Sequence, residues 1–195
     1  MPRSLFRRHA LARLAATAAC LFCLAPVTSK AQTALDDITA RKQINVAIPT
    51  DFPPYGFVGT DLKPQGLDID MANYIAARLG VKVELVPVTS ANRIPYLQTK
   101  KADLVISTLG KNAEREKVID FTAASVAGNL MARNPQLATE FKFVLKDSPN
   151  FIGVAKGEDK LRLKVNEILA QAKASGDLDK MAMRWLGRPA GELPQ

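Results

Sequence analysis

The stretch ADLVISTLGKNAERE, residues 102–116, joins an apolar run to the start of a charged helix. Its first part, ADLVI, is the kind of run that forms a buried strand. Ser107, Thr108 and Gly110 follow it, and Arg115 comes five positions later. Ligands of an open parallel sheet bind beyond the carboxyl ends of its strands. We therefore expect these residues to form a donor-rich site for an anionic group, most naturally a carboxylate.

The segments before this stretch predict a mostly parallel sheet flanked by helices. Residues 44–49 (INVAIP) and 81–88 (VKVELVPV) have the pattern of strands. Between them, apolar residues at helical spacing begin after Gly66 and end at Gly80, which suits a C-terminal cap. Residues 91–101 form a short helix with a proline in its first turn. Alternating strands and helices imply right-handed crossovers, and hence an α/β fold.

The second half of the chain is less regular. Residues 125–140 are predicted to form a helix that is broken at Asn134 and Pro135. Two strands are expected at residues 141–145 and 151–157, around a turn at 146–150. Beyond them, two apolar stripes at helical spacing predict two amphipathic helices, which end near residue 175 and at Gly187.

A second arginine stands in the same kind of position as Arg115. Arg93 lies in the loop that follows residues 81–88, next to Ser90. Arg115 itself lies between Glu114 and Glu116, so it could belong to a solvated cluster of helical charges instead of a binding site. Two arginines that each follow a strand and a hydroxyl group favour the site.

The loop TDFPPYGFVG, residues 50–59, carries three aromatic residues after the first strand. Phe52 and Tyr55 are predicted to line the ligand pocket with Phe57, and ordinary packing of a proline-rich turn is the competing explanation. Asp68 and Asp70 are expected to cap and charge the start of a helix. Trp185 is expected in the core.

The first 31 residues resemble a secretory signal peptide. Four arginines and no acidic residue precede an apolar run of fourteen residues, and the small residue Ala31 ends the segment. A membrane anchor is the competing interpretation, but the run is shorter than the ~20 apolar residues that span a bilayer. Lipoprotein processing at Cys20 is a further alternative, which would leave an apolar segment at the new terminus.

Loss of residues 1–31 would exclude several classes of function. The net charge would fall from +8 to +3, which leaves no basic stripe for a nucleic acid. The two cysteines and the single histidine lie within this segment. Thiol nucleophiles, disulfides, imidazole bases and most zinc sites are therefore excluded. We expect no cofactor and no metal, and binding is favoured over turnover.

Four motifs resemble the periplasmic solute-binding proteins of polar amino-acid ABC transporters, bacterial family 3, with the type II periplasmic binding fold. They are residues 50–57 (TDFPPYGF), 66–72 (GLDIDMA), 86–122, which include TSANRIP and AEREKVIDFT, and 153–187 (GVAKGEDK to RWLG). The resemblance implies that Arg115 grips a ligand α-carboxylate and that Ser107, Thr108 and Gly110 line the pocket. TSANRIP is similar to the glutamate and aspartate binders, which implies that Ser90 and Arg93 hold an acidic ligand.

One departure from that family concerns the second lobe. Family members cross into a second α/β lobe after a segment like VIDFT, but only twenty positions separate Phe121 from Phe141 here. We expect one lobe, built from residues 32–125 and 141–195, with residues 126–140 as a remnant or connector. The second lobe, which meets the ligand's ammonium group and closes over it, is largely missing.

These features predict a periplasmic protein that binds a polar, acidic amino acid for an inner-membrane ABC transporter permease, with affinity impaired by the internal deletion. The alternative is a non-binding interaction protein or a degenerate remnant. A periplasmic lyase similar to cyclohexadienyl dehydratase is less favoured, because those relatives use residues of the missing lobe.

Overall fold

A central sheet of five strands organises residues 32–128 and 148–191, which are the residues that the computed structural model describes. The strand order is β5-β1-β6-β8-β7. β5 and β6 both pair in parallel with β1, whereas β8 runs antiparallel to β6 and β7. The bounds are β1 Gln43–Pro49, β5 Lys82–Val88, β6 Leu104–Leu109, β7 Ile119–Gly128 and β8 Ser148–Ala155.

Helices cover both faces of this sheet. The larger core packs β1, β6 and β8 against α2 (Ala34–Arg41), α3 (Leu67–Leu79), α6 (Asp159–Ala174) and α7 (Asp177–Leu186). The smaller core packs the opposite face against α4 (Arg93–Gln98). Side chains of a strand alternate between the faces, so Val46 and Ile48 join the larger core and Ala47 joins the smaller one.

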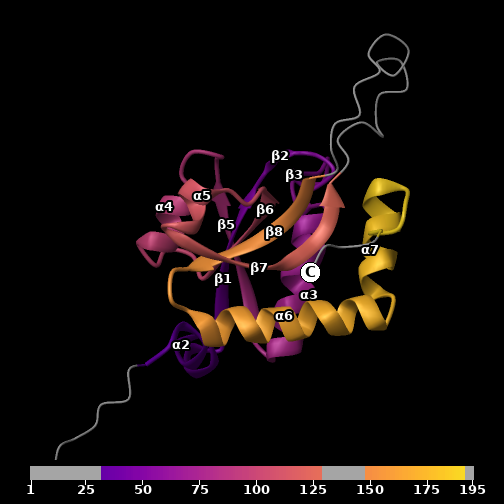
Figure 1. Ribbon diagram of the computed structural model, residues 1–195. Coiled ribbons are helices and arrows are strands. Elements are labelled where there is room, and N and C mark those ends of the chain that lie inside the picture. The colour runs from indigo at the N-terminus through magenta and orange to yellow at the C-terminus, as the bar shows by residue number, and fades with distance from the viewer. Residues whose placement is uncertain (1–31, 129–147, 192–195) are drawn as a thin grey trace, which may run out of the picture. The chain divides into compact units, whose positions relative to one another are not determined.

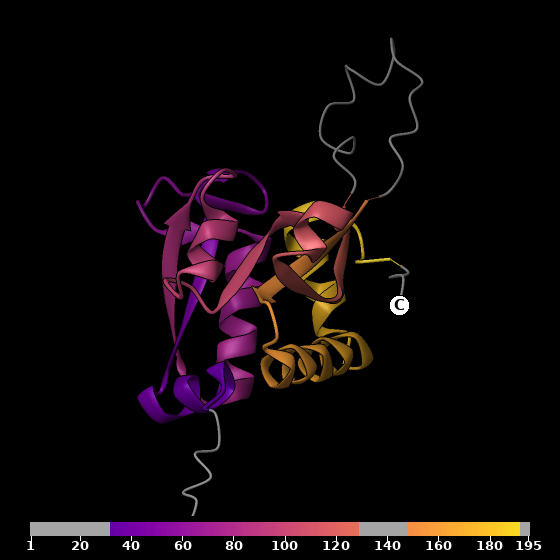
Figure 2. The ribbon, with the colours of Figure 1, turned by 60° about the vertical axis from the view of Figure 1, so that its left-hand side comes forward.

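The two edges of the sheet carry different elements. In Figure 1 the carboxyl ends of β1 and β6 point to the upper edge, where the short α5 (Ala113–Glu116) lies, and α2 and α6 lie at the lower edge. Figure 2 shows the same separation from another side. A small antiparallel sheet also lies at the upper edge, made of β2 (Asp51–Phe52), β3 (Gly56–Val58) and β4 (Pro64–Gln65). Side chains that follow β1 and β6 are thereby gathered at one edge.

The α/β class, the parallel order of the first three strands, and the helices of residues 67–79, 93–98, 159–174 and 177–186 are confirmed. The predicted helix at 125–140 is wrong at residues 125–128, which belong to β7, and residues 126–128 pair with residues 148–150 of β8. Those pairs also make Ser148–Asn150 part of a strand instead of a turn. Backbone pairing with β8 decides the conformation of this short apolar run, whose periodicity is ambiguous.

Several predictions fall outside the described residues. They are the signal peptide at 1–31, the break at Asn134 and Pro135, and the strand at 141–145. No helix within residues 32–128 and 148–191 is long and apolar enough to cross a membrane.

Gly66, the N-cap of α3, is the glycine whose replacement we expect to cost most. Its φ of 128° and ψ of 172° lie in a region that is essentially restricted to glycine, and an added Cβ would lie 2.2 Å from the carbonyl oxygen of Tyr55. Gly66→Ala should lower the free energy of unfolding in urea by about 3 kcal/mol or more. Gly80→Ala is the matched control, because Gly80 has a φ of 68° but no atom within 4 Å of the added Cβ. Equal losses for both variants would contradict this prediction.

Candidate functional site

The candidate site begins with a contact between Arg93 and Ser107. Arg93 is the first residue of α4, and Ser107 lies near the carboxyl end of β6. Arg93 Nη1 donates a hydrogen bond of 2.5 Å to Ser107 Oγ, and both side chains are buried. The α4 helix thus turns its first side chain across the smaller core toward the strand end. Asn92 supports this turn, because its Oδ1 accepts a hydrogen bond from the backbone of Thr89.

Arg93 is an unusual group to find buried. The residue is only 7% exposed, and its Nε has no hydrogen-bond partner within the described residues. Burial lowers the pKa of Arg93 below its ordinary value, and the neighbouring positive charge of Arg115 lowers it further. Arginine nevertheless keeps its proton in proteins. The protein therefore buries a guanidinium cation whose Nε–H could donate a hydrogen bond to a ligand.

Arg115 turns back toward the same strand end. Its Nη1 donates to the carbonyl oxygen of Gly110 at 2.6 Å, and its backbone N–H donates to Oδ1 of Asn112, the N-cap of α5. Glu114 pairs with Lys117, and Glu116 pairs with Lys111. The two acidic neighbours are thus bound to lysines, and Arg115 has no carboxylate partner among the residues of 32–128 and 148–191. Arg115 therefore does not neutralise Glu114 and Glu116, as the alternative of a solvated cluster of helical charges would require.

The other predicted polar residues are less closely associated. Ser90 is exposed in the turn before α4. Alternation along β6 places Ser107 on the face of Val105 and Leu109, and Thr108 toward the opposite face. Thr108 and Gly110 are half-buried. The structure therefore brings together Arg93, Arg115, Ser107 and the backbone of Gly110, and among the described residues no hydrogen bond joins Ser90 or the Thr108 hydroxyl to this group.

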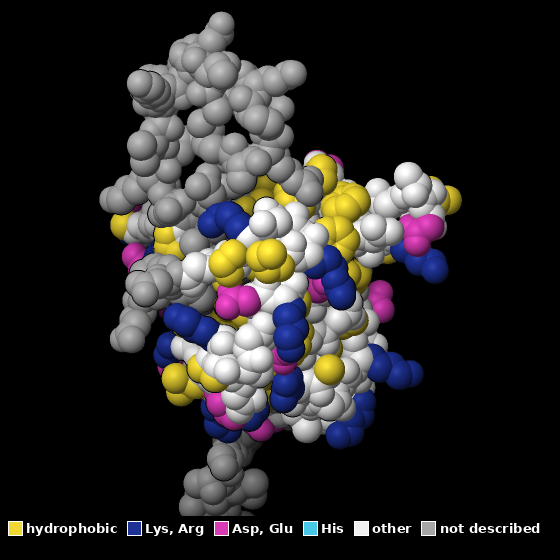
Figure 3. Space-filling model, turned by 90° about the vertical axis from the view of Figure 1, so that its right-hand side faces the viewer, with side chains coloured by type: hydrophobic (Ala, Val, Ile, Leu, Met, Phe, Trp, Pro, Cys, Tyr) yellow, Lys and Arg dark blue, Asp and Glu magenta, His cyan; other side chains and the backbone are white. Residues whose placement is uncertain are grey.

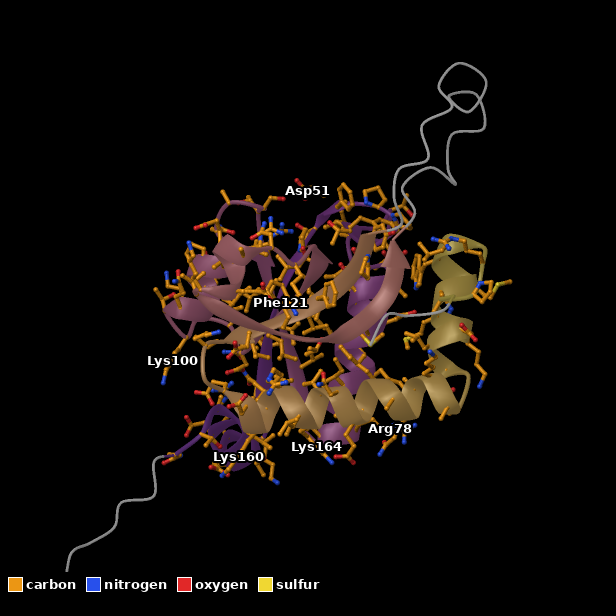
Figure 4. All side chains as sticks on the ribbon, in the orientation of Figure 1. Asp51, Arg78, Lys100, Phe121, Lys160 and Lys164 are labelled. Atoms are coloured by element: carbon orange, nitrogen blue, oxygen red, sulfur yellow. The ribbon has the colours of Figure 1, made fainter. Side chains whose placement is uncertain are left out.

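The three aromatic residues of the loop have three different surroundings. Phe52 is 37% exposed and stacks on Tyr55, with ring centroids 5.9 Å apart. Tyr55 is buried in the larger core, so its ring packs against the side of Phe52 that faces the core. Phe57 instead meets Trp185 edge to face at 5.8 Å. Asp51, the exposed residue before Phe52, marks this edge of the molecule in Figure 4.

Asp68 and Asp70 do not cap α3 with their side chains, although both lie in its first turn. Asp68 is buried, its Oδ2 has no hydrogen-bond partner among the described residues, and burial raises its pKa to about 7. Asp70 accepts a hydrogen bond from Trp185 Nε1. The motif GLDIDMA gave the position of the two carboxylates, but the partners of Asp70 are Arg184 and Trp185 of α7, which are more than a hundred residues away in sequence.

Among the hollows that the described residues line, one lies beside α5 and has a volume of about 200 Å³. Its charged groups neutralise each other, because Lys156 pairs with Asp120 and Arg162 with Asp159. Cations that are already paired with carboxylates attract an anionic ligand only weakly. This hollow is therefore a weaker candidate for the binding site than the region of Arg93 and Arg115.

Comparison with known proteins gives a family match. The family described as bacterial extracellular solute-binding proteins, family 3, matches residues 44–188. The L-cystine-binding protein TcyJ of Escherichia coli K12 is 29% identical over 98 residues, which are 50% of this chain and 37% of that protein. Cyclohexadienyl dehydratase of Pseudomonas aeruginosa is 31% identical over 123 residues, or 63% of this chain and 44% of that protein. The chain thus matches less than half the length of these curated relatives.

A solved structure extends the similarity to the fold. The arginine-bound form of domain 1 from TmArgBP is 32% identical, with a TM-score of 0.59. That match covers 70% of this chain and 98% of that single domain.

The buried carboxyl of Asp68 should make stability depend on pH. Its pKa of about 7 in the folded state lies above the ordinary value of 3.8, so the unfolded chain loses this proton first as the pH rises. Stability should therefore fall between about pH 4 and pH 7 and then level off. In the wild type, the free energy of unfolding in urea should therefore fall between pH 5 and pH 8. In Asp68→Asn this fall should be smaller by on the order of 2 kcal/mol. Asp51→Asn, at an exposed carboxyl, is the control. Parallel pH profiles for the wild type and Asp68→Asn would show that Asp68 does not titrate in this range.

Proposed function

The chain belongs to family 3 of the bacterial extracellular solute-binding proteins, and we propose that it binds a polar amino acid, preferably an acidic one, in the periplasm. Residues 1–31 would direct its secretion, and the loaded protein would deliver its ligand to the permease of an inner-membrane ABC transporter. The observation that carries this proposal is the pair of arginines, Arg93 and Arg115, at the carboxyl end of β6.

Electrostatics supports an anionic ligand at this position. Burial lowers the pKa of Arg93, and repulsion between its guanidinium group and that of Arg115 lowers it further. A ligand with negative charge would relieve that repulsion and supply an acceptor for the Nε of Arg93, which has none within residues 32–128 and 148–191. An acidic amino acid carries two carboxylates. We assign the α-carboxylate to Arg115 and the side-chain carboxylate to Arg93.

The remaining predicted residues complete the proposed site. Ser107 holds the Arg93 guanidinium, and Gly110 holds that of Arg115. Phe52 forms an exposed aromatic wall, with Tyr55 behind it. Ser90 and the backbone at Thr108 would reach the ligand from the rim of the site.

We further propose that residues 32–125 and 141–195 form one lobe, with residues 126–140 as the remnant of a second. A single domain of a related protein has been solved with arginine bound, which supports ligand binding by one lobe. If the missing lobe contributed about 3 to 4 kcal/mol, affinity would be a hundredfold to a thousandfold weaker than in a two-lobed relative.

Titration calorimetry with glutamate, aspartate, glutamine and arginine tests the proposal on protein purified from cells that express the full chain. Glutamate or aspartate should release heat, and Arg115→Ala should weaken that binding at least tenfold, because it removes a charge-assisted bond of about 1.5 to 3 kcal/mol. Lys117→Ala is the matched control on the same helical turn. If none of the four amino acids binds, or if Arg115→Ala binds as the wild type does, the proposed site is wrong.

The preference for an acidic ligand has a separate test at Arg93. Arg93→Gln should weaken glutamate binding at least tenfold more than glutamine binding, because only glutamate carries the second carboxylate. Affinities from the same calorimetric titrations give this ratio. Equal losses for the two amino acids would place Arg93 outside the side-chain subsite.

A lyase is the second candidate function, because one relative that matches at 31% identity is a cyclohexadienyl dehydratase. Such chemistry requires an acid and a base that converge on the substrate, and the described site contains arginines and a serine instead. Turnover of prephenate or arogenate by the purified chain would favour the lyase over the binding protein.

A further inference from the structure

Trp185 joins two elements that are far from it in sequence. It lies near the end of α7, and its Nε1 donates a hydrogen bond of 2.7 Å to Oδ2 of Asp70 in the first turn of α3. Its ring also meets the ring of Phe57 edge to face, with centroids 5.8 Å apart and planes at 83°. The indole is only partly buried, at the margin of the larger core. Trp185 is therefore a bridge between α3 and β3 instead of a simple core residue.

Asp70 fixes the orientation of this indole. The carboxylate also accepts a bond from Arg184, but that side chain is 69% exposed, and exposed ion pairs contribute little. A hydrogen bond from an indole N–H to an ionised carboxylate is stronger than one between neutral groups. The bond between Asp70 and Trp185 thus sets where the edge of the ring lies relative to Phe57. Figure 3 shows the α7 side of the molecule, where apolar and charged side chains are interspersed.

Phe57 transmits this constraint to the small sheet. In the ladder of that sheet Phe57 pairs with Asp51 and Gly56 pairs with Phe52. Gly56 leaves no room on its other side, since an added Cβ would lie 2.1 Å from the carbonyl oxygen of Pro49. The small sheet is thus held between the end of β1 and the indole of Trp185.

The first turn of α3 holds the same loop at a second point. The backbone N–H groups of Leu67 and Asp68 donate to the carbonyl oxygens of Pro54 and Tyr55 at 3.0 and 2.8 Å. The segment that carries Phe52 is therefore fixed at residues 54–55 by backbone bonds and at residue 57 by an aromatic contact. Only the second attachment depends on a side chain of α7.

We propose that Trp185, oriented by Asp70, is a positioning residue of the ligand site: it fixes the β2–β3 hairpin and so places Phe52 at the rim of that site. This inference rests on the proposed function, because Phe52 must face a ligand for its position to matter. Trp185 is also the only tryptophan of the chain. Its emission therefore reports directly on the contact with Phe57.

The experiment compares wild type, Trp185→Phe, which keeps a ring but removes the N–H donor, and Arg184→Gln, which removes only the exposed ion pair. Hydrogen exchange of residues 51–58 without ligand, calorimetric affinity and thermal stability are measured for each. Trp185→Phe should raise exchange in residues 51–58 at least threefold and weaken ligand binding about tenfold, and Arg184→Gln should change neither. In the wild type, ligand should shift the emission of Trp185.

Phe57→Leu approaches the same contact from β3 and should reproduce the exchange and affinity changes if Trp185→Phe is too unstable to purify. Unchanged exchange in residues 51–58, or a lower melting temperature with unchanged affinity, would assign Trp185 a purely structural role. Failure of the wild type to bind any of the four amino acids would overturn the proposed function. In that case the exchange measurement by itself still decides whether Trp185 holds the hairpin.

Discussion

Two guanidinium groups meet at the carboxyl end of β6, and within residues 32–128 and 148–191 neither has an acidic partner. Arg93 is held by the hydroxyl of Ser107, and Arg115 is held by the carbonyl of Gly110. Both acceptors are neutral, so the positive charge in this region stays uncompensated. Burying such charge costs free energy, which a structural role would not explain. Under the proposed function, a negatively charged ligand would supply the compensation.

The parallel order of the first strands is what gathers these groups. Because β5, β1 and β6 run in one direction, the segments that follow them all emerge at the same edge of the sheet. The segment after β1 carries Phe52, the one after β5 leads to Arg93, and the one after β6 leads to Arg115. The three segments that follow these strands thereby bring Phe52, Arg93 and Arg115 to one edge of the sheet.

The small sheet shows how a loop of this edge is held in place. Its backbone is bonded to the first turn of α3, and its Phe57 ring meets Trp185 of α7. The C-terminal helix therefore contributes to the edge of the molecule that would bind the ligand, although it carries none of the proposed contact residues. Asp70 takes part through its bond to the indole. Asp68, two positions earlier, is buried, and its Oδ2 has no hydrogen-bond partner in the part of the chain that the structure describes.

The sequence determined the α/β class, the parallel strands, most helices and the two arginines, because hydrophobic periodicity, caps and residues after strands depend on neighbours in the chain. It also predicted the family through the motifs around Arg93 and Arg115. Only the tertiary structure decided that residues 125–128 form a strand, that Tyr55 is buried, and that Asp70 serves Trp185. Those outcomes depend on partners distant in sequence, such as β8 and α7, and a pattern of local spacing contains no information about them.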